Sequence, residues 1–224
     1  MRTLAIGDVH GCFTALAALE KFVPFRPDDL LVTLGDYVDR GPDSFAVIDW
    51  LIAYGKRAKL VALRGNHEIM MLDARTGRYA LDRFLYCGGT ATLDSYSPLG
   101  DEGRLADVPD EHWRFIEASR SWYETETHFF VHANAYPDYP LEIQPELMLF
   151  WESFNSPSPH ESGKVMVCGH TPQRSGVPLN IGHAVCIDTW ACGDGWLTCL
   201  DVASGRFWQA DQRGATRRGW LDEL

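Results

Sequence analysis

Three short loops, each directly after a short apolar run, constrain the fold of this chain more than any other feature. They read Gly7-Asp8-Val9-His10-Gly11, Gly35-Asp36-Tyr37-Val38-Asp39-Arg40-Gly41 and Arg64-Gly65-Asn66-His67-Glu68. The apolar runs before them, residues 4–6, 30–34 and 60–63, predict β-strands. Helical patterns lie between these runs, at residues 13–22 and from Pro42 to a stop at Gly55. The order β-α-β-α-β predicts parallel strands whose loops share one sheet edge, where open α/β sheets bind ligands.

The residue types in these loops suit a pair of metal ions. Asp8 and His10 are two residues apart, and the flanking glycines allow the sharp bend that turns both toward one cation. The carboxylate of Asp36 has two oxygens with which to bridge two cations, and Asn66 offers a neutral carbonyl oxygen. Two metals about 3.5–4 Å apart hold a phosphoester and a hydroxide for in-line displacement. The loops therefore predict a two-metal centre for phosphoester hydrolysis.

Further ligands are expected from later strands, because Asp36 and Asn66 alone would leave the second metal under-coordinated. His132 follows the apolar run 129–131, and His170 follows residues 165–169. Both are thus at predicted strand ends, as the earlier ligands are. His183 precedes its strand and is expected to be structural. Three other histidines lie among polar residues and are expected to be exposed: His112, His128 and His160.

The remaining pattern predicts the rest of the fold. Residues 68–121 are mostly helical, with breaks at 87–89 and 97–100. The final third turns to strands at 127–132, 164–168, 183–188, 195–201 and 206–210. We expect an α/β fold with α+β character, in which two mixed β-sheets pack as a central sandwich flanked by helices. Residues 153–163 are too short for a linker, so residues 1–224 are expected to form a single domain.

Composition excludes several classes of protein. The formal net charge is −11 and the pI is near 5.1, which argues against a nucleic-acid surface. The basic residues Arg213, Arg217 and Arg218 are expected to form a solvated tail. The sequence has no apolar run of membrane-spanning length and no room for a signal peptide before Gly7, so we expect a cytoplasmic protein without a membrane partner.

The six cysteines include no Cys-x-x-Cys pair and are expected to be mostly buried free thiols. Cys12 is the exception, because its place directly after the first loop would allow it to sense oxidation or metal.

The motifs resemble the metal-dependent phosphoprotein phosphatase family, whose members carry Gly-Asp-x-His-Gly, Gly-Asp-x-x-Asp-Arg-Gly and Gly-Asn-His-Glu in this order. Val131-His132-Ala133 and Gly169-His170-Thr171-Pro172 continue the match, so it spans nearly the whole chain. The chain looks most similar to the compact bacterial and phage members. The family includes serine/threonine protein phosphatases and symmetrical dinucleoside tetraphosphatases, and both hydrolyse phosphate links with water held on two metals.

The resemblance implies a role for each matching residue. Asp8, His10 and Asp36 would bind the first metal, and Asp36 would bridge to a second metal completed by Asn66, His132 and His170. His67 would be the general acid, held by Asp39. Arg40 and Arg64 would bind the phosphate oxygens. The nucleophile would be a hydroxide between the metals, which the ligand set predicts to be manganese, with iron or zinc as alternatives.

One departure from the family concerns the substrate. The family usually carries a further phosphate-binding arginine between the two late histidines, and residues 133–169 contain no arginine. Near the expected place the chain reads Phe150-Trp151-Glu152-Ser153. Arg174 and Lys164 are the candidates to replace that arginine.

Three functions follow as hypotheses. The leading one is a metal-dependent serine/threonine protein phosphatase, which would also act on small aryl phosphates. The alternative is a symmetrical dinucleoside tetraphosphate hydrolase, and a remote one is a phosphate-binding module without catalysis. The dinucleotide hypothesis predicts aromatic residues that converge beside the metals, with these candidates: Tyr86, Tyr96, Tyr136, Tyr139, Trp151 and Trp190.

Overall fold

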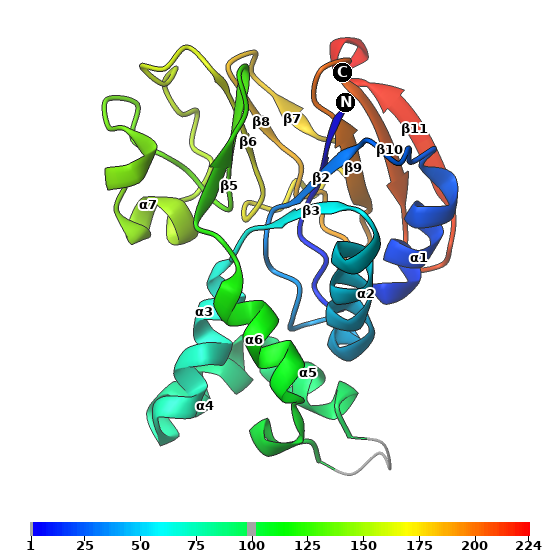
Figure 1. Cartoon of the computed structure of the whole chain (residues 1–224), viewed down its shortest axis with the longest axis vertical. Coiled ribbons are helices and arrows are strands. Elements are labelled where there is room, and N and C mark those ends of the chain that lie inside the picture. Colours follow the sequence, from blue (N-terminus) through cyan, green and yellow to red (C-terminus); the bar gives the residue numbers. More distant parts are fainter. Residues whose placement is uncertain (1, 98–101) are drawn as a thin grey trace.

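The computed structural model describes residues 2–97 and 102–224 and contains two β-sheets packed face to face with helices around them (Figure 1). The first sheet has the strand order β11-β10-β9-β1-β2-β3. Its first half is parallel and comprises β1 (Thr3–Ile6), β2 (Leu30–Thr33) and β3 (Lys59–Ala62). Its second half is antiparallel and comprises β9 (Leu197–Asp201), β10 (Arg206–Ala210) and β11 (Thr216–Trp220).

The second sheet repeats this mixed design with the order β4-β5-β6-β8-β7. Its parallel strands are β5 (His128–Val131), β6 (Val165–Cys168) and β8 (Ala184–Cys186). The edge strands β4 (Trp122–Glu124) and β7 (Leu179–Asn180) pair antiparallel to them. Each sheet therefore contributes three parallel strands whose carboxyl ends can carry ligands.

The core forms three layers because side chains along each strand alternate between faces. Ala5 and Val32 of the first sheet pack against Phe130 and Val167 of the second, in the layer between the sheets. Leu4, on the other face of β1, belongs to a layer that α1 (Phe13–Phe22) and α2 (Ser44–Arg57) cover. A third layer lies between the second sheet and α7 (Glu146–Trp151). The predicted sandwich of two mixed sheets flanked by helices is confirmed.

Short helices gather at one end of the molecule, below the sheets in Figure 1. They are α3 (Asn66–Asp73), α4 (Arg78–Phe84), α5 (Thr90–Ser95) and α6 (Asp110–Ala118). A π-helical segment, Leu85–Gly89, joins α4 to α5, and Gly88 within it has a φ of 113°. This is the predicted break at 87–89. The other predicted break, at 97–100, falls largely outside the described residues.

Several boundaries differ from the prediction for physical reasons. Helix α2 continues through Gly55 to Arg57, because a glycine weakens a helix without breaking its hydrogen bonds. Strand β11 is not a solvated tail. Arg217 donates to Gln209 Oε1 at 2.7 Å and to the Gly176 carbonyl at 2.6 Å, and its guanidinium lies 4.3 Å from the Trp196 ring centroid. The basic residues predicted a solvated tail, but they belong to a strand in which only alternate residues point to solvent.

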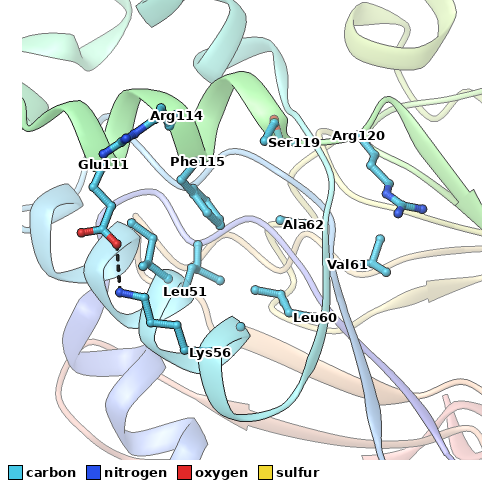
Figure 2. A pocket seen from close by; sticks show the side chains of 13 residues that line it. Leu51, Lys56, Leu60, Val61, Ala62, Glu111, Arg114, Phe115, Ser119 and Arg120 are labelled. Carbon is cyan, nitrogen blue, oxygen red and sulfur yellow. Dashed lines mark hydrogen bonds and ion pairs between the residues drawn. The ribbon is translucent and has the colours of Figure 1, made fainter.

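An apolar groove beside β3 lies away from every predicted site residue. It is bounded by α2, β3 and α6, with Leu51, Leu60 and Phe115 at its base and an ion pair between Lys56 and Glu111 at its mouth (Figure 2). None of the predicted ligands lines it, so the site must be sought at the strand ends. Among the described residues, no helix is long and apolar enough to cross a membrane.

Candidate metal centre

The carboxyl ends of the parallel strands bring the predicted residues of both sheets together. His10 follows β1, Asp36 follows β2 and Asn66 begins α3 after β3, whereas His132 and His170 follow β5 and β6. All five are substantially buried. His10, Asp36 and His170 have positive φ values of 46°, 50° and 65°, in the left-handed region that L-residues seldom adopt. Such backbone strain is concentrated at functional sites.

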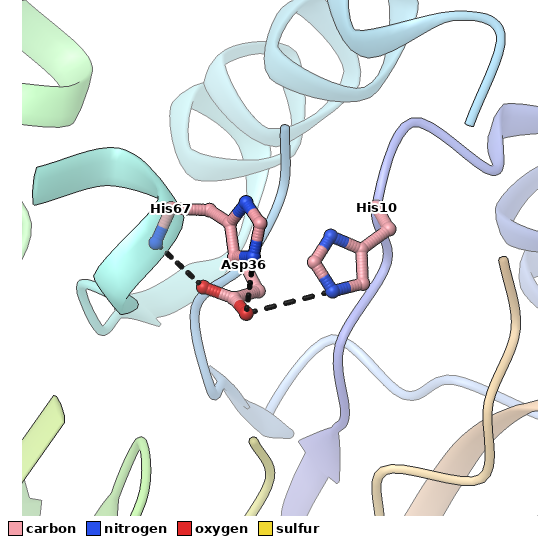
Figure 3. A group of neighbouring side chains, drawn as sticks. All are labelled: His10, Asp36 and His67. Atoms are coloured by element: carbon pink, nitrogen blue, oxygen red, sulfur yellow. Dashed lines mark hydrogen bonds and ion pairs between the residues drawn. The ribbon is translucent and has the colours of Figure 1, made fainter. Parts of the chain in front are cut away.

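Asp36 lies at the centre of this arrangement. Its Oδ2 is 3.5 Å from His10 Nε2, and its Oδ1 is 3.5 Å from His132 Nε2 (Figure 3 shows the His10 side). The two oxygens of one carboxylate thus face different histidines, one from each sheet. Two groups of candidate metal ligands share Asp36, the first with His10 and His67 and the second with His132 and His170. This is the position expected of a bridging carboxylate.

Asn66 joins the second group. Its Oδ1 lies 3.0 Å from His132 Nε2 and 3.1 Å from His170 Nδ1, so three donor atoms from three elements converge. Gly65, before it, is required by close approach: a Cβ there would collide with the Asp36 carboxylate. The third loop can therefore reach the second only with glycine at this position.

The histidine rings are fixed by backbone carbonyls on their far sides. His10 Nδ1 donates to the Val38 carbonyl at 2.9 Å, and His132 Nδ1 donates to the Leu34 carbonyl at 2.9 Å. His170 Nε2 donates to the Trp151 carbonyl at 3.1 Å. Each bond selects the tautomer whose remaining nitrogen faces the centre with its lone pair. Such outer hydrogen bonds orient metal-ligating histidines in general.

The protonation equilibria favour a cation at this position. Burial lowers the pKa of His10 to about 3 and that of His132 to about 4, so both rings are neutral at pH 7 and can act as ligands. Burial acts to raise the pKa of Asp36, but the positive charge that the surrounding imidazoles carry when protonated at low pH outweighs it and holds the pKa below its usual range. A buried carboxylate beside neutral imidazoles lacks a compensating charge, which a divalent ion would supply. The residues present therefore fit a dinuclear metal site.

Asp8 lies beside the centre but is oriented differently. Its two oxygens accept from the His170 backbone N–H at 3.2 and 3.0 Å, and it belongs to neither ligand group. Burial, the Asp188 charge and the Asp36 charge raise the pKa of Asp8 well above its usual range. Asp188, which follows β8, is itself buried, and burial raises its pKa to about 7. Asp188 belongs to none of the motifs, so sequence patterns could not identify it.

His67 and Asp39 form the predicted pair. His67 Nδ1 lies 2.6 Å from Asp39 Oδ2, and Asp39 Oδ1 accepts from the Thr92 hydroxyl at 2.8 Å. Burial acts to lower the pKa of His67, but the Asp36 charge and the Asp39 hydrogen bond outweigh it and raise the pKa. The ring is thereby suited to carry a proton. Thr92, which comes from α5, had no motif that could have identified it.

Arg40 lies across the mouth of the first group. Its Nη1 donates to His10 Nε2 at 2.8 Å, and its Nη2 donates to His67 Nε2 at 2.8 Å. A cation bound at His10 would have to displace the first of these bonds, which would release an N–H for a substrate oxygen.

Arg64 is not brought into this group. Its Nη2 donates to the Glu117 carbonyl at 2.7 Å, and its Nε donates to the Ser119 hydroxyl at 3.1 Å. These contacts satisfy carbonyls at the end of α6, a common place for a basic side chain. Arg64 therefore lies apart from the ligand groups in this structure, because motif spacing does not encode side-chain direction, and its phosphate contact stays a prediction.

The two expected replacements for the late arginine also lie elsewhere. Lys164 pairs with Glu124 at 2.6 Å at the start of β6, the end opposite the ligands. Arg174 lies 5.3 Å from the Trp190 ring centroid, on the loop beyond His170.

Glu68 is an organising residue to which the sequence analysis assigned no role. Its carboxylate is fully buried and accepts from the backbone N–H groups of Asp36 and Gly65 at 2.8 Å and of Tyr37 at 2.7 Å. It thus ties the second loop to the third. The spacing of an acid three residues after Gly65, typical of a helix N-terminal capping box, was the available signal.

Two expectations for the remaining histidines and thiols were wrong. His112 and His160 are buried, because His112 Nδ1 bonds Tyr96 Oη at 2.9 Å and His160 Nε2 donates to the Tyr139 carbonyl at 2.9 Å. Cys12 has no accessible surface, and burial raises the pKa of its thiol to about 12, which leaves it inert rather than a sensor. All six cysteines are free, as predicted.

The candidate aromatic residues do not form one pocket among the described residues. Tyr86 is 92% exposed, Tyr96 is buried against His112, and Tyr136 packs on Tyr139 with ring centroids 5.4 Å apart. Trp151 and Trp190 each lie under an arginine.

Comparison with known proteins matches this geometry. Residues 1–194 fit the family model described as calcineurin-like phosphoesterase. The chain is 46% identical over 71 residues to serine/threonine-protein phosphatase 1 of Salmonella typhimurium, which covers 31% of each chain. It is 33% identical over 140 residues to a symmetrical bis(5'-nucleosyl)-tetraphosphatase of Janthinobacterium sp., which covers 62% of this chain and 46% of that one. The matched segments thus span less than half of either curated relative.

A solved structure extends the likeness to the whole fold. The cold-active protein-tyrosine phosphatase of a Shewanella species superposes with a TM-score of 0.64 at 15% identity, over 97% of this chain and 80% of that one.

Proposed function

The chain belongs to the calcineurin-like phosphoesterase family, and we propose that it is a metal-dependent phosphoester hydrolase that acts as a serine/threonine protein phosphatase. The observation that carries the proposal is the position of Asp36, whose two oxygens face a separate histidine from each sheet. Two divalent cations, manganese first among them, would polarise the phosphoester and activate a water when bound. Iron and zinc are compatible with the same donor set.

His10 and Asp36 would hold the first metal, and Asp36, Asn66, His132 and His170 the second. Asp8 is assigned to the first metal by the loop motif, and its oxygens would have to exchange their present bonds with the His170 backbone N–H for the cation. His67 would donate a proton to the leaving oxygen, because its Nε2 faces the mouth of the centre while Asp39 holds Nδ1. Arg40 would bind phosphate oxygens in exchange for its present bonds to the two imidazoles.

A symmetrical dinucleoside tetraphosphatase is the second candidate, since one relative that matches over 140 residues carries that name. The dispersed aromatic residues favour a phosphomonoester over a substrate with two bases. The expected setting is cytoplasmic, with phosphoproteins or small phosphoesters as substrates rather than nucleic acid, in keeping with the net charge of −11.

A substrate panel tests the choice. The manganese-loaded protein is assayed with phosphoserine, phosphothreonine and phosphotyrosine peptides and with diadenosine tetraphosphate. We expect the highest kcat/KM on phosphoserine or phosphothreonine. A preference for the dinucleotide would overturn the protein-phosphatase assignment and leave the metal chemistry in place.

The mechanism is tested separately with His67→Asn. Loss of a general acid lowers kcat by about 10²- to 10⁴-fold, whereas metal content should stay at the wild-type level. Wild-type turnover by a metal-loaded variant would eliminate His67 as the acid.

A further inference from the structure

The outer edge of β3 is only partly paired. β3 is the last strand of the first sheet, with β2 on its inner side. At its carboxyl end, the Arg120 N–H donates to the Ala62 carbonyl at 2.9 Å and the Arg64 N–H donates to the Arg120 carbonyl at 2.7 Å. The Ala62 carbonyl therefore points away from β2, and the N–H and C=O of Leu60 point to the same side, because strand geometry repeats every second residue. In the part of the chain that the structure describes, no backbone hydrogen bond reaches the Leu60 groups on this side.

The side chains of this edge face the apolar groove of Figure 2. Leu60 and Ala62 line the groove from β3, and Phe115 and Ala118 line it from α6. Its volume is about 400 Å³, within the range of sites that bind ligands. Residues directly opposite each other on neighbouring strands point to the same face. A strand added at Leu60 would therefore direct a side chain into the groove, where an apolar one fits.

Basic side chains outnumber acidic ones around the groove. Lys56, Arg114 and Arg120 are exposed and line it with one acid, Glu111, which pairs with Lys56 at 2.9 Å. The rim thus carries an excess of positive charge in a chain whose formal net charge is −11. Complementary charge steers a partner to a surface and fixes its register. The groove therefore fits an extended segment with apolar residues at its centre and acidic residues beside them.

The groove lies along the strand that leads to the candidate metal centre. β3 ends at Ala62, and Asn66 begins α3 four residues later, so at most about 14 Å of extended chain separates them. The end of α6 is tied to the same loop, because the Arg64 Nη2 donates to the Glu117 carbonyl at 2.7 Å. A segment paired with β3 could thus belong to a protein whose phosphorylated residue lies in the centre.

We propose that the open edge of β3 and its groove bind an extended, acidic segment of the phosphoprotein substrate, which adds to the first sheet as a further strand and places an apolar side chain against Phe115. The inference rests on the proposed protein-phosphatase function and specifies how the substrate protein is recognised. Main-chain hydrogen bonds to the edge supply affinity, and the groove supplies specificity. Binding a partner also explains why the edge stays open, since unpaired edges are otherwise sites of unwanted pairing.

Binding is measured by fluorescence anisotropy with a labelled nine-residue peptide that has a Val-Thr-Val centre flanked by aspartates. A matched peptide has lysines in place of the aspartates. We expect the acidic peptide to bind the wild type more tightly than the basic one, and less tightly as the salt concentration rises. Ala118→Phe fills the groove from an exposed position and should weaken binding by about 10- to 100-fold, the loss of one buried valine. Ala53→Phe is the control, because Ala53 is exposed on α2 outside the groove, and should leave binding unchanged.

Arg114→Glu tests the charge of the rim separately from the shape of the groove. It should weaken binding of the acidic peptide by about three- to tenfold and strengthen binding of the basic one. Arg218→Glu makes the same charge change on β11, at the other edge of the sheet, and should alter neither. Equal binding of the two peptides by the wild type, or full binding by Ala118→Phe, would overturn the inference. A dimer in sedimentation that Ala118→Phe converts to a monomer would assign the edge to a second copy of the chain instead.

Turnover separates the inference from the proposed function. The acidic segment is joined to a phosphoserine peptide by a flexible spacer of about eight residues, which should lower KM by at least about tenfold and leave kcat unchanged. Ala118→Phe should abolish this difference in KM and leave hydrolysis of p-nitrophenyl phosphate unchanged. Equal KM values with and without the segment would overturn the substrate role of the groove. If the manganese-loaded wild type hydrolyses neither peptide, the proposed function fails, whereas the anisotropy measurements still decide what the groove binds.

Discussion

At the scale of single residues, the site depends on the hydrogen bonds that orient each side chain from the side facing away from the centre. The loop motifs correctly indicated which residues meet, because Asp36, Asn66, His132 and His170 all lie at ends of parallel strands. They could not indicate direction, and Arg64 shows the consequence: it belongs to a motif but contacts the end of α6. Thr92 shows the opposite case, since it lies outside every motif and still bonds Asp39.

The pair of His67 and Asp39 leads to a prediction of pH dependence. Asp36 and the Asp39 hydrogen bond raise the pKa of His67 against the effect of burial, so the acid stays protonated to higher pH than a free imidazole. Asp39→Asn removes one of these charges and should move the alkaline limb of the kcat profile to lower pH. The exposed Asp49→Asn is the control and should leave the limb in place. An unmoved limb in Asp39→Asn would show that the limb does not report His67.

At the scale of elements, close backbone approach decides whether the loops can meet. Gly169, between β6 and His170, lies so near the Asp8 carboxylate that an added Cβ would collide with it. The sequence predicted β6 and its loop but not this contact, because residues 8 and 169 are far apart in the chain.

Gly169→Ala should therefore lower the content of both metals and kcat together, since Asp8 and the His170 backbone would be forced apart. Gly55→Ala is the matched control. A Cβ at Gly55 meets only Leu60 at 3.5 Å, and alanine in a helix stabilises by about 1 kcal/mol or less relative to glycine. Metal content, measured by mass spectrometry, distinguishes the two variants. A Gly169→Ala protein that binds both metals fully would refute the predicted separation of Asp8 from the His170 backbone.

Strand β11 was not predicted, because its basic residues were interpreted as a solvated tail. Arg217 bonds Gln209 and the Gly176 carbonyl, whereas Arg218 is exposed. Arg217→Ala should lower the free energy of unfolding by about 1 to 3 kcal/mol, as measured by urea denaturation. Arg218→Ala should change it by less than about 0.5 kcal/mol. Equal changes in the free energy of unfolding for the two variants would show that Arg217, like Arg218, lies in a solvated segment.

At the scale of the whole molecule, neither sheet contains a complete site. The first supplies His10, Asp36 and Asn66, and the second supplies His132 and His170. We propose that residues 1–224 unfold as one domain, because an apolar layer joins the two sheets directly beneath the centre. The apolar runs predicted the strands of each sheet, but which faces pack together depends on long-range contacts.

Metal binding should therefore stabilise the whole chain. At a manganese concentration 100 times its Kd, each occupied site adds about 2.7 kcal/mol to the free energy of unfolding. Each site should therefore raise Tm by roughly 5 to 10 °C for a chain of this size. Calorimetry should show one unfolding transition that chelation moves down as a unit. Two transitions, of which only one responds to chelation, would contradict the single-domain proposal.

The central claim is that Asp36 bridges two metals, of which the first is held by loops of the first sheet and the second by loops of both sheets. Electron paramagnetic resonance of the protein titrated with manganese tests it most directly, because two bridged Mn²⁺ ions are magnetically coupled. We predict a coupled dinuclear spectrum at two manganese ions per chain, and its loss in Asp36→Asn. Saturation at a single uncoupled ion in the wild type, or an unchanged coupled spectrum in Asp36→Asn, would contradict the account.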